Sequence, residues 1–402
     1  MPKTHAHIMM TQLNVKEGIR QFGERGNAAL LKELNQLHEQ QALMPEKEED
    51  MSYDEKKKAL RYLIFIKEKR DSTINTRGCA DRRSQSEYTN KVDTSSPTVS
   101  LEAMLLMCAT DAKEGRYIAV TDIPGAFLHV DMEQDVHMLL EGTTAELIMK
   151  LEPSLYRKSV WKNKHGKPML YVKLRKALYG TLQIALLFWR LLSDTLMEWG
   201  FQLNDYDKCV ANKTINGKQC TIIWHVGNLK ISHTEKKVVD HIIDKLNKKF
   251  REYSPLCTNT EVRIPRHDVG LYDKRKVMLS MYEYINKMLT EPPSDMNRVS
   301  KVQAAGHFFS INPDTTKLLE EKAQLFHHLV AKLLYLCRHT IQDIQTAVEF
   351  LCTRVKDPDK DDYKKLTKVM QHIRNTKYLT LSIESSAAQN GGWTVHTLYT
   401  RT

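Results

Sequence analysis

A β-hairpin predicted over residues 221–232 carries the residues of greatest chemical interest. The segment TIIWHVGNLKIS has apolar, strand-forming runs on both sides of Gly227-Asn228, a pattern typical of a hairpin whose turn favours glycine. Another predicted strand, over residues 117–122, ends at Asp122. Carboxylate oxygen is the ligand that Mg²⁺ prefers, whereas an asparagine amide is neutral and glycine has no side chain. Asp122 is therefore the one carboxylate that the end of this strand and the turn offer together.

Two segments that contain glycine precede the hairpin. The first, VTDIPGAFLHV, places Phe127 shortly after Asp122, and the second, LRKALYGTLQIALLFW at residues 174–189, contains Gly180 and Gln183. A glycine lets its backbone approach a ligand or another chain segment closely. Taken alone, each segment also fits ordinary packing, as a strand-end aspartate with a core phenylalanine, or as a strand, a glycine turn and a buried helix.

The densest basic region lies between residues 56 and 83. The whole chain has 60 Lys and Arg against 49 Asp and Glu, a formal net charge of +11, which suits either a polyanionic partner or a basic soluble protein. The simpler interpretation of the basic region is a solvated charged surface; the alternative is contact with nucleic-acid phosphates. Its members are Lys56, Lys57, Lys58, Arg61, Lys67, Lys69, Arg70, Arg77, Arg82 and Arg83.

Length and cysteine usage limit the class of protein. A chain of 402 residues is long enough for more than one domain. The seven cysteines are scattered, without a CxxC pair, which argues for reduced thiols in a cytoplasmic or nuclear compartment and against a structural zinc site. The sequence also predicts no signal peptide, no secretion and no membrane span, because its apolar runs are too short.

The hydrophobic pattern predicts an alternation of strands and helices followed by a mostly helical second half. A helical stretch from about Ala28 has apolar residues at helical spacing, and Ser100 is a plausible N-cap for a helix at 98–113. Asn216-Gly217 predicts a tight hairpin turn just before the hairpin at 221–232. The remaining predicted helices cover residues 182–199, 236–250, 324–337, 341–356 and 361–376, and the remaining predicted strands cover 62–66 and 170–177.

The hairpin and the two glycine segments together resemble the Ty1/copia-type retrotransposon reverse transcriptases. In that family the palm turn has an aromatic residue or His, an apolar residue, Asp-Asp and often Leu; here the same places hold the sequence HVGNL at residues 225–229. The family also has Asp, three residues and Ala-Phe-Leu, as in DIPGAFL, and Ala-Leu-Tyr-Gly, two residues and Gln, as in ALYGTLQ. Further matches in family order, such as SPTVSLEAMLL and DIQTAVEFLCTRV, extend the resemblance from about Met10 to Glu384.

This resemblance implies an α+β fold of the right-hand polymerase type. Fingers, palm and thumb would surround a ferredoxin-like antiparallel palm sheet, with a mostly helical C-terminal part. The implied regions are an N-terminal helical segment at 1–50, fingers at 51–115, palm with fingers insertions at 116–255, thumb or connection at 256–384, and an unstructured tail at 385–402 in place of an RNase H domain.

The resemblance also implies roles for particular residues. Template-directed DNA synthesis from deoxynucleoside triphosphates would use a pair of Mg²⁺ ions, with Asp122 as a ligand. Phe127 would lie under the incoming sugar, Gly180 and Gln183 would face template or nucleotide, and Arg77 would contact the triphosphate. A primer–template of RNA or DNA would lie along Lys69, Arg70, Arg82 and Arg83, and components of a retrotransposon particle would be further partners.

The departures from the family pattern predict impaired catalysis. Gly227 and Asn228 stand where the family has its Asp pair, so the metal-binding charge falls from three carboxylates to one and Mg²⁺ binding is expected to be weakened or lost. Because the apolar runs beside the turn survive, the strand that ends at Asp122 is still expected to lie next to the hairpin. The open alternatives are a non-enzymatic nucleic-acid-binding relic of a retrotransposon pol protein, or an unselected pseudogene product.

Overall fold

The computed structural model describes residues 13–68, 72–81, 83, 95–250, 262–264, 267–273, 276–387 and 393–401. The chain forms two compact units, each made of separate stretches of sequence. Unit 1 combines residues 1–98, 123–203 and 252–254, and unit 2 combines residues 99–122, 204–251 and 255–402. These units cut across the five regions that the sequence predicted, and that finer division stays a prediction.

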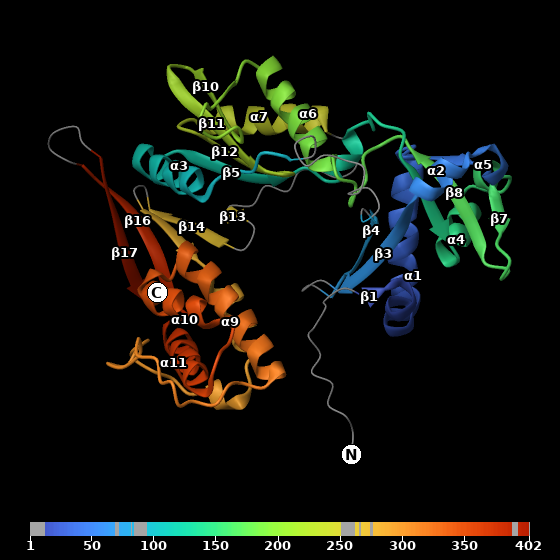
Figure 1. The fold of residues 1–402 in the computed structure, drawn as a ribbon. Helices are drawn as coiled ribbons and strands as arrows, with labels where there is room; N and C mark the ends of the chain where they lie inside the picture. Colours follow the sequence, from blue (N-terminus) through green and yellow to red (C-terminus); the bar gives the residue numbers. More distant parts are fainter. Residues whose placement is uncertain are drawn as a thin grey trace. The chain divides into compact units, whose positions relative to one another are not determined.

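Unit 1 is built on a mixed seven-stranded sheet. Its main path is β1-β3-β6-β8-β2, with β4 added to β3 and β7 added to β8 (Figure 1). The β3–β6 pair is parallel and the other pairs are antiparallel. The strands are β1 (Leu13–Asn14), β2 (Leu43–Glu46), β3 (Leu60–Glu68), β4 (Ile74–Ala80), β6 (His137–Glu141), β7 (Val160–Lys162) and β8 (Pro168–Leu174).

Helices of unit 1 cover this sheet and close its core. In α1, Leu30, Leu34 and Leu37 recur at helical spacing and are at most 2 % exposed, which confirms the predicted apolar face. The helix is longer than expected, and its helical backbone is interrupted by a kink at Gly23, where φ is 55°. The helices and the short strand β9 are α1 (Val15–Glu39), η1 (Glu48–Asp50), α2 (Tyr53–Lys58), η3 (Ala126–His129), α4 (Thr143–Leu151), α5 (Pro153–Tyr156), α6 (Ile184–Glu198) and β9 (Gln202–Leu203).

Unit 2 contains an antiparallel sheet in the order β5-β12-β11-β10. The predicted Asn216-Gly217 turn joins β10 to β11, with φ values of 51° and 72°, as a type I′ turn requires. Helix α7 packs on β5 and β12, and α3 begins at the predicted N-cap Ser100, whose hydroxyl accepts the Ala103 N–H. These elements are α3 (Leu101–Glu114), β5 (Tyr117–Asp122), β10 (Val210–Ile215), β11 (Lys218–His225), β12 (Asn228–His233) and α7 (Lys236–Lys249).

The rest of unit 2 comprises a second antiparallel sheet, β13-β14-β15-β16-β17, and a group of helices with one continuous apolar core. Within that core, Phe326, Leu333, Val348 and Leu366 are fully buried. The elements are β13 (Val262–Ile264), β14 (His267–Asp273), β15 (Lys276–Ser280), α8 (Tyr282–Leu289), η4 (Ser294–Met296), α9 (Glu320–His339), η5 (Gln342–Ile344), α10 (Gln345–Arg354), α11 (Lys360–Thr376), β16 (Leu379–Ala387) and β17 (Trp393–Arg401).

Strand β17 corrects the prediction that residues 385–402 form an unstructured tail. It pairs along its whole length with β16, from Leu379 opposite Arg401 to Ala387 opposite Trp393. The sequence WTVHTLYTR is rich in β-branched and aromatic residues, which favour strands. Residues 385–387 and 393–401 therefore belong to paired strands.

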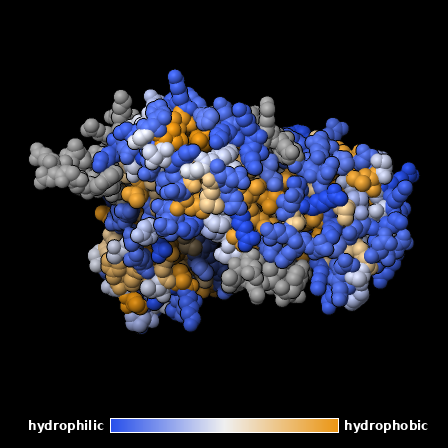
Figure 2. All heavy atoms as spheres, turned by 90° about the horizontal axis from the view of Figure 1, so that it is seen from above, coloured by the Kyte–Doolittle hydropathy of each residue, from blue (hydrophilic) through white to orange (hydrophobic). Residues whose placement is uncertain are grey.

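The surface is mainly polar on the face drawn in Figure 2, with smaller apolar areas between the hydrophilic residues. In the part of the chain that the structure describes, no helix combines the length and apolar character needed to cross a bilayer. The mixed α and β content agrees with the predicted α+β class.

Candidate functional site

The β5–β12 ladder brings the predicted catalytic positions together. Asp122 is the last residue of β5 and lies directly opposite Asn228, the first residue of β12. Directly opposed residues in an antiparallel pair have Cα atoms about 4.5 to 5.5 Å apart. The prediction that the Asp122 strand lies next to the hairpin is thereby confirmed. Asp122 is exposed and Asn228 is half-buried, so both are placed at the edge of the buried sheet.

The turn itself differs by one residue from the prediction. It consists of Val226 and Gly227, because His225 pairs with Asn228 in the β11–β12 ladder. The left-handed backbone falls on Val226, at φ 56°, and not on Gly227. A positive φ at the first turn position alone is the type II′ pattern, for which glycine is the preferred first residue. A β-branched residue there is strained, so Gly227 does not provide the conformational relief that the sequence suggested.

A buried ion network lies on the sheet beside this turn. The Lys230 ammonium of β12 pairs with the Asp111 carboxylate of α3, and these residues are 5 % and 1 % exposed. The Arg116 guanidinium lies 3.7 Å from the Asp111 carboxylate and 2.8 Å from the Glu114 carboxylate. It also donates a hydrogen bond to the Thr221 hydroxyl at 3.1 Å. Burial lowers the pKa of Lys230, but the charge of Asp111, the nearby Cys108 and the hydrogen bond to Asp111 together outweigh burial, and the pKa is raised. Lys230 is therefore a paired cation.

The donor set around the turn does not fit a pair of Mg²⁺ ions. Of the three family positions, Asp122 keeps a carboxylate, Asn228 opposite it is a neutral amide and Gly227 has no side chain, whereas two closely spaced divalent ions need several anionic oxygens. Asp111 is committed to Lys230 within the network. Among the residues that the structure describes, no group of three or more His, Cys, Asp or Glu side chains is placed to hold a metal.

The candidate nucleotide-contacting residues of unit 1 form a connected cluster. The guanidinium carbon of Arg77, on β4, lies 4.4 Å from the ring centroid of Tyr179. The Tyr179 ring in turn meets the edge of Phe127 at 4.6 Å, and Phe127 packs edge-to-face on Phe188 at 6.0 Å. Arg77 is exposed, whereas Phe127 is only 6 % exposed. The cation is thus held over an aromatic support, a geometry that stabilises it.

Gly180 approaches a backbone that the sequence did not identify. Its φ is 95°, and a Cβ at this position would lie 2.1 Å from the Ala80 carbonyl oxygen. The neighbouring Tyr179 carbonyl accepts the Ala80 N–H at 2.7 Å. Glycine is needed here so that the 179–180 segment can lie against β4. Gln183 is the N-cap residue just before α6 and is 9 % exposed, and among the described residues its Oε1 is buried without a hydrogen-bond partner.

Glu33 was missed by the sequence interpretation, yet it supports Arg77. Its carboxylate, on α1, accepts the Gly78 N–H at 2.8 Å, directly after Arg77. Burial raises the pKa of Glu33, while the Gly78 N–H and the Arg77 charge act in the opposite direction. Gly78 leaves room for Tyr62, whose hydroxyl would lie 1.7 Å from a Cβ at position 78. The only signal in the sequence was a lone acidic residue on a helix face.

The predicted nucleic-acid residues are only partly within the described chain. Lys69, Arg70 and Arg82 lie outside the described residues. Arg83 is exposed, and its guanidinium forms an ion pair with Asp81. Arg83 is therefore the one member of this predicted set that lies within the described residues.

Comparisons with known proteins identify the family of this chain. Residues 52–292 match the family model of reverse transcriptase (RNA-dependent DNA polymerase). The chain is 23 % identical over 289 residues to the retrovirus-related Pol polyprotein from transposon TNT 1-94 of Nicotiana tabacum, a match that covers 70 % of this chain and 20 % of that polyprotein. The chain thus spans about a fifth of the length of this curated relative.

Among solved structures, this chain is similar to telomerase from Candida albicans, determined with a fragment of telomeric RNA. The match covers 82 % of this chain and 63 % of the telomerase chain. The TM-score is 0.33 and the identity 8 %. The family match spans well over half of the chain and contains both Asp122 and the hairpin turn. The chain belongs to the reverse transcriptase family, as a Ty1/copia-type reverse transcriptase region.

Proposed function

We propose that this chain is the polymerase part of a copia-type reverse transcriptase that binds primer–template nucleic acid and is impaired in extending it. The observation that carries the proposal is the register that sets Asp122 opposite Asn228. In this assignment β5 and the β11–β12 hairpin belong to the palm, β3 and β4 to the fingers, and residues 256–384 to the thumb or connection.

The proposed impairment follows from charge at the palm turn. Two-metal nucleotidyl transfer needs one ion to activate the primer hydroxyl and another to neutralise the triphosphate. With Gly227 and Asn228 in place of two carboxylates, Asp122 is the one of the three family positions that keeps a negative charge. Each factor of ten in rate corresponds to about 1.4 kcal/mol of transition-state stabilisation, so the loss of both ions suppresses extension by many factors of ten.

Nucleotide recognition is proposed for the cluster of unit 1. Arg77 would contact the triphosphate while Tyr179 holds its guanidinium in place. Phe127 would act through Tyr179, because its ring is covered by Tyr179 and Phe188. Gln183 would reach template or nucleotide with its buried amide. Gly180 contributes by letting Tyr179 lie against β4.

The test is primer extension on an RNA template with Mg²⁺ and, separately, with Mn²⁺. The chain as it stands is expected to be inactive, and Gly227→Asp with Asn228→Asp is expected to restore extension. Adding Asp122→Ala to that double variant should abolish it again. Extension by the unchanged chain would refute the impairment, and an inactive double variant that is folded and binds nucleic acid would refute the assignment of the lesion to this turn.

A purely nucleic-acid-binding role is the second candidate, because the chain keeps the Arg77–Tyr179 cluster but lacks the Asp pair of the family. In that role the protein would bind RNA or DNA in the cytoplasm or nucleus, alone or with retrotransposon particle components. Failure of every palm variant to extend a primer, together with salt-sensitive binding that depends on Arg77, would favour this role over an impaired polymerase.

A further inference from the structure

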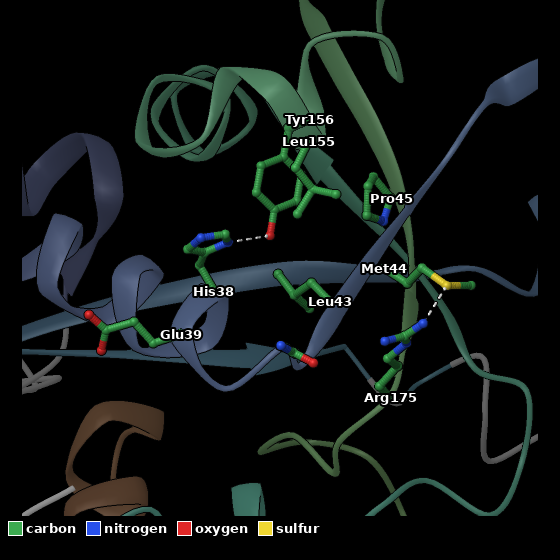
Figure 3. Close-up of a pocket in the computed structure, with 9 residues that line it drawn as sticks. His38, Glu39, Leu43, Met44, Pro45, Leu155, Tyr156 and Arg175 are labelled. Carbon is green, nitrogen blue, oxygen red and sulfur yellow. Dashed lines mark hydrogen bonds between the residues drawn. The ribbon is translucent and has the colours of Figure 1, made fainter. Parts of the chain in front are cut away.

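A pocket of about 450 Å³ lies within unit 1, away from the residues assigned above. Its volume falls in the range of small-molecule sites. The wall is formed by the end of α1, by β2, by α5 and by the residue after β8 (Figure 3). Its nine lining residues are His38, Glu39, Gln41, Leu43, Met44, Pro45, Leu155, Tyr156 and Arg175.

The backbone at the end of α1 is strained where it enters the pocket. The Ala42 N–H donates to the Leu37 carbonyl at 3.0 Å and the Gln41 N–H donates to the His38 carbonyl at 2.8 Å, which is the Schellman pattern of helix termination. The left-handed position of that pattern is normally glycine, yet here it is Gln41, at φ 50°. A side chain retained at a strained position that lines a pocket suggests a functional use.

The His38 side of the pocket offers a fixed hydrogen-bond donor. The Tyr156 hydroxyl lies 3.2 Å from His38 Nδ1, and the two rings meet edge-to-face. Burial raises the pKa of Tyr156 to about 12, so its hydroxyl keeps its proton at neutral pH and can donate to Nδ1. A neutral His38 then carries its proton on Nε2.

The opposite side of the pocket offers a cation. Figure 3 shows Arg175 and His38 on different sides of Leu43. The Arg175 N–H donates to the Ala42 carbonyl at 2.9 Å, which fixes its backbone, and its guanidinium lies 3.3 Å from Met44 Sδ. Thioether sulfur is a weak acceptor. Within the described part of the chain Arg175 forms no salt bridge, so its remaining N–H donors can bind an anion.

We propose that this pocket binds a nucleoside monophosphate. Arg175 binds the phosphate, as a guanidinium does well, and the apolar surface of Leu43, Pro45 and Leu155 holds the base. The Gln41 amide pairs with the base edge, for which adenine offers the matching donor and acceptor. Glu39 at the same pocket disfavours a triphosphate, because its negative charge repels additional phosphate groups.

The nucleotide has two sources with the same chemistry, a free nucleotide or the terminal nucleotide of a strand. The binding experiment is equilibrium dialysis of the full chain with radiolabelled AMP, with adenosine and ATP as competitors. AMP is expected to bind more tightly than either. If adenosine competes as well as AMP, the proposed contact between Arg175 and the phosphate is overturned. If ATP competes better than AMP, the proposed role of Glu39 is overturned.

The variants separate this pocket from ordinary packing. Arg175→Ala is expected to weaken AMP binding about 10- to 100-fold, the loss typical of a charged hydrogen bond. Gln41→Gly should raise the thermal midpoint, because it relieves the left-handed strain, and yet weaken AMP binding. Arg157→Ala removes an exposed arginine that does not line the pocket and should change neither. Equal AMP affinity in all of these proteins, or no AMP binding at millimolar concentration, overturns the proposal.

The proposal is independent of the palm assignment. Asp122→Ala and Arg77→Ala are expected to leave AMP affinity unchanged. A 5′-phosphorylated oligoadenylate that competes with AMP in the unchanged chain identifies a strand end as a source, and an oligonucleotide that does not compete identifies the free nucleotide.

Discussion

Two residues, one in each unit, adopt left-handed backbone in different ways. Gly180 adopts φ 95° and has Ala80 against it, so both its conformation and its lack of a side chain are needed. Val226 adopts φ 56° in the turn opposite Asp122 although it has a branched Cβ. Retained strain of this kind persists only when the surrounding structure imposes it; here the ladders of β11 with β12 and of β12 with β5 do so.

Gly180→Ala is predicted to destabilise unit 1 by about 3 kcal/mol, since the new methyl group would overlap the Ala80 carbonyl and the positive φ is unfavourable for alanine. Gly217→Ala is the matched control. Gly217 also has a positive φ, 72°, but has open space around its Cβ position, so its cost is about 1 to 2 kcal/mol. Urea denaturation of both variants measures the difference, and equal costs would show that contact with Ala80 is unimportant.

Val226→Gly is predicted to be more stable than Val226→Ala by about 1 kcal/mol. In an ordinary strand the order is the reverse, because glycine has the larger conformational entropy when unfolded. The comparison between the two variants cancels the loss of the half-buried valine side chain. Thermal denaturation gives the order, and an alanine variant as stable as the glycine variant would mean that position 226 is not left-handed in solution.

The sequence predicted some single-residue features and not others, for a physical reason. Ser100 as an N-cap and Asn216-Gly217 as a hairpin turn depend on neighbouring residues, and both were confirmed. The Gly180 contact depends on Ala80, about 100 residues earlier, and the Glu33 contact with Gly78 depends on how α1 meets β4. Contacts of this kind leave no pattern in a local stretch of sequence.

At the scale of elements, α3 is joined to β5 by apolar packing and to β12 by charge. Leu105 and Cys108 of α3 contribute to an apolar cluster with Ile118 and Val120 of β5. Asp111 and Lys230 add a buried ion pair, in which removal of one partner leaves the other charge without compensation. This pair links the helix before Asp122 to the strand that begins at Asn228.

Asp111→Asn is therefore predicted to destabilise unit 2 by about 3 to 5 kcal/mol. Combining it with Lys230→Met should recover most of that loss, because the double variant leaves no unpaired lysine and adds an apolar side chain. Chemical denaturation followed by tryptophan fluorescence reports the effect, since Trp224 is buried in the same sheet. A double variant less stable than Asp111→Asn would mean that the pair is not the source of the coupling.

Most elements were predictable because their hydrophobic period is strong. The helix predicted at 236–250 is α7, with Val238, Val239, Ile242 and Leu246 buried. The helix predicted at 361–376 is α11, which begins at the capping residue Asp359. Strand β17 was missed because its sequence follows a Gly-Gly pair and has no long apolar run, so its structure depends on its partner β16.

At the scale of the whole molecule, the positive charge predicts how the chain associates with polyanions. Primer–template binding should weaken steeply as salt rises, because each phosphate contact releases condensed counterions. Arg77→Ala should lower the affinity and make the salt slope about one unit shallower. The control is Arg157→Ala, an exposed arginine outside the proposed fingers strands. Filter binding at several salt concentrations measures both, and identical slopes for the unchanged chain and Arg77→Ala would place Arg77 outside the nucleic-acid contact.

The long-range pairing of β5 with β12 also has a consequence for biosynthesis. Asp122 and Asn228 are about 100 residues apart in the chain, and the stretch 123–203 between them folds into unit 1. Closing a loop of this length has an entropic cost, and contacts between distant residues slow folding. Strand β5 and helix α3 therefore leave the ribosome long before their partner strand exists. Their apolar faces stay exposed during that interval, so we expect chaperones to bind this segment of the nascent chain.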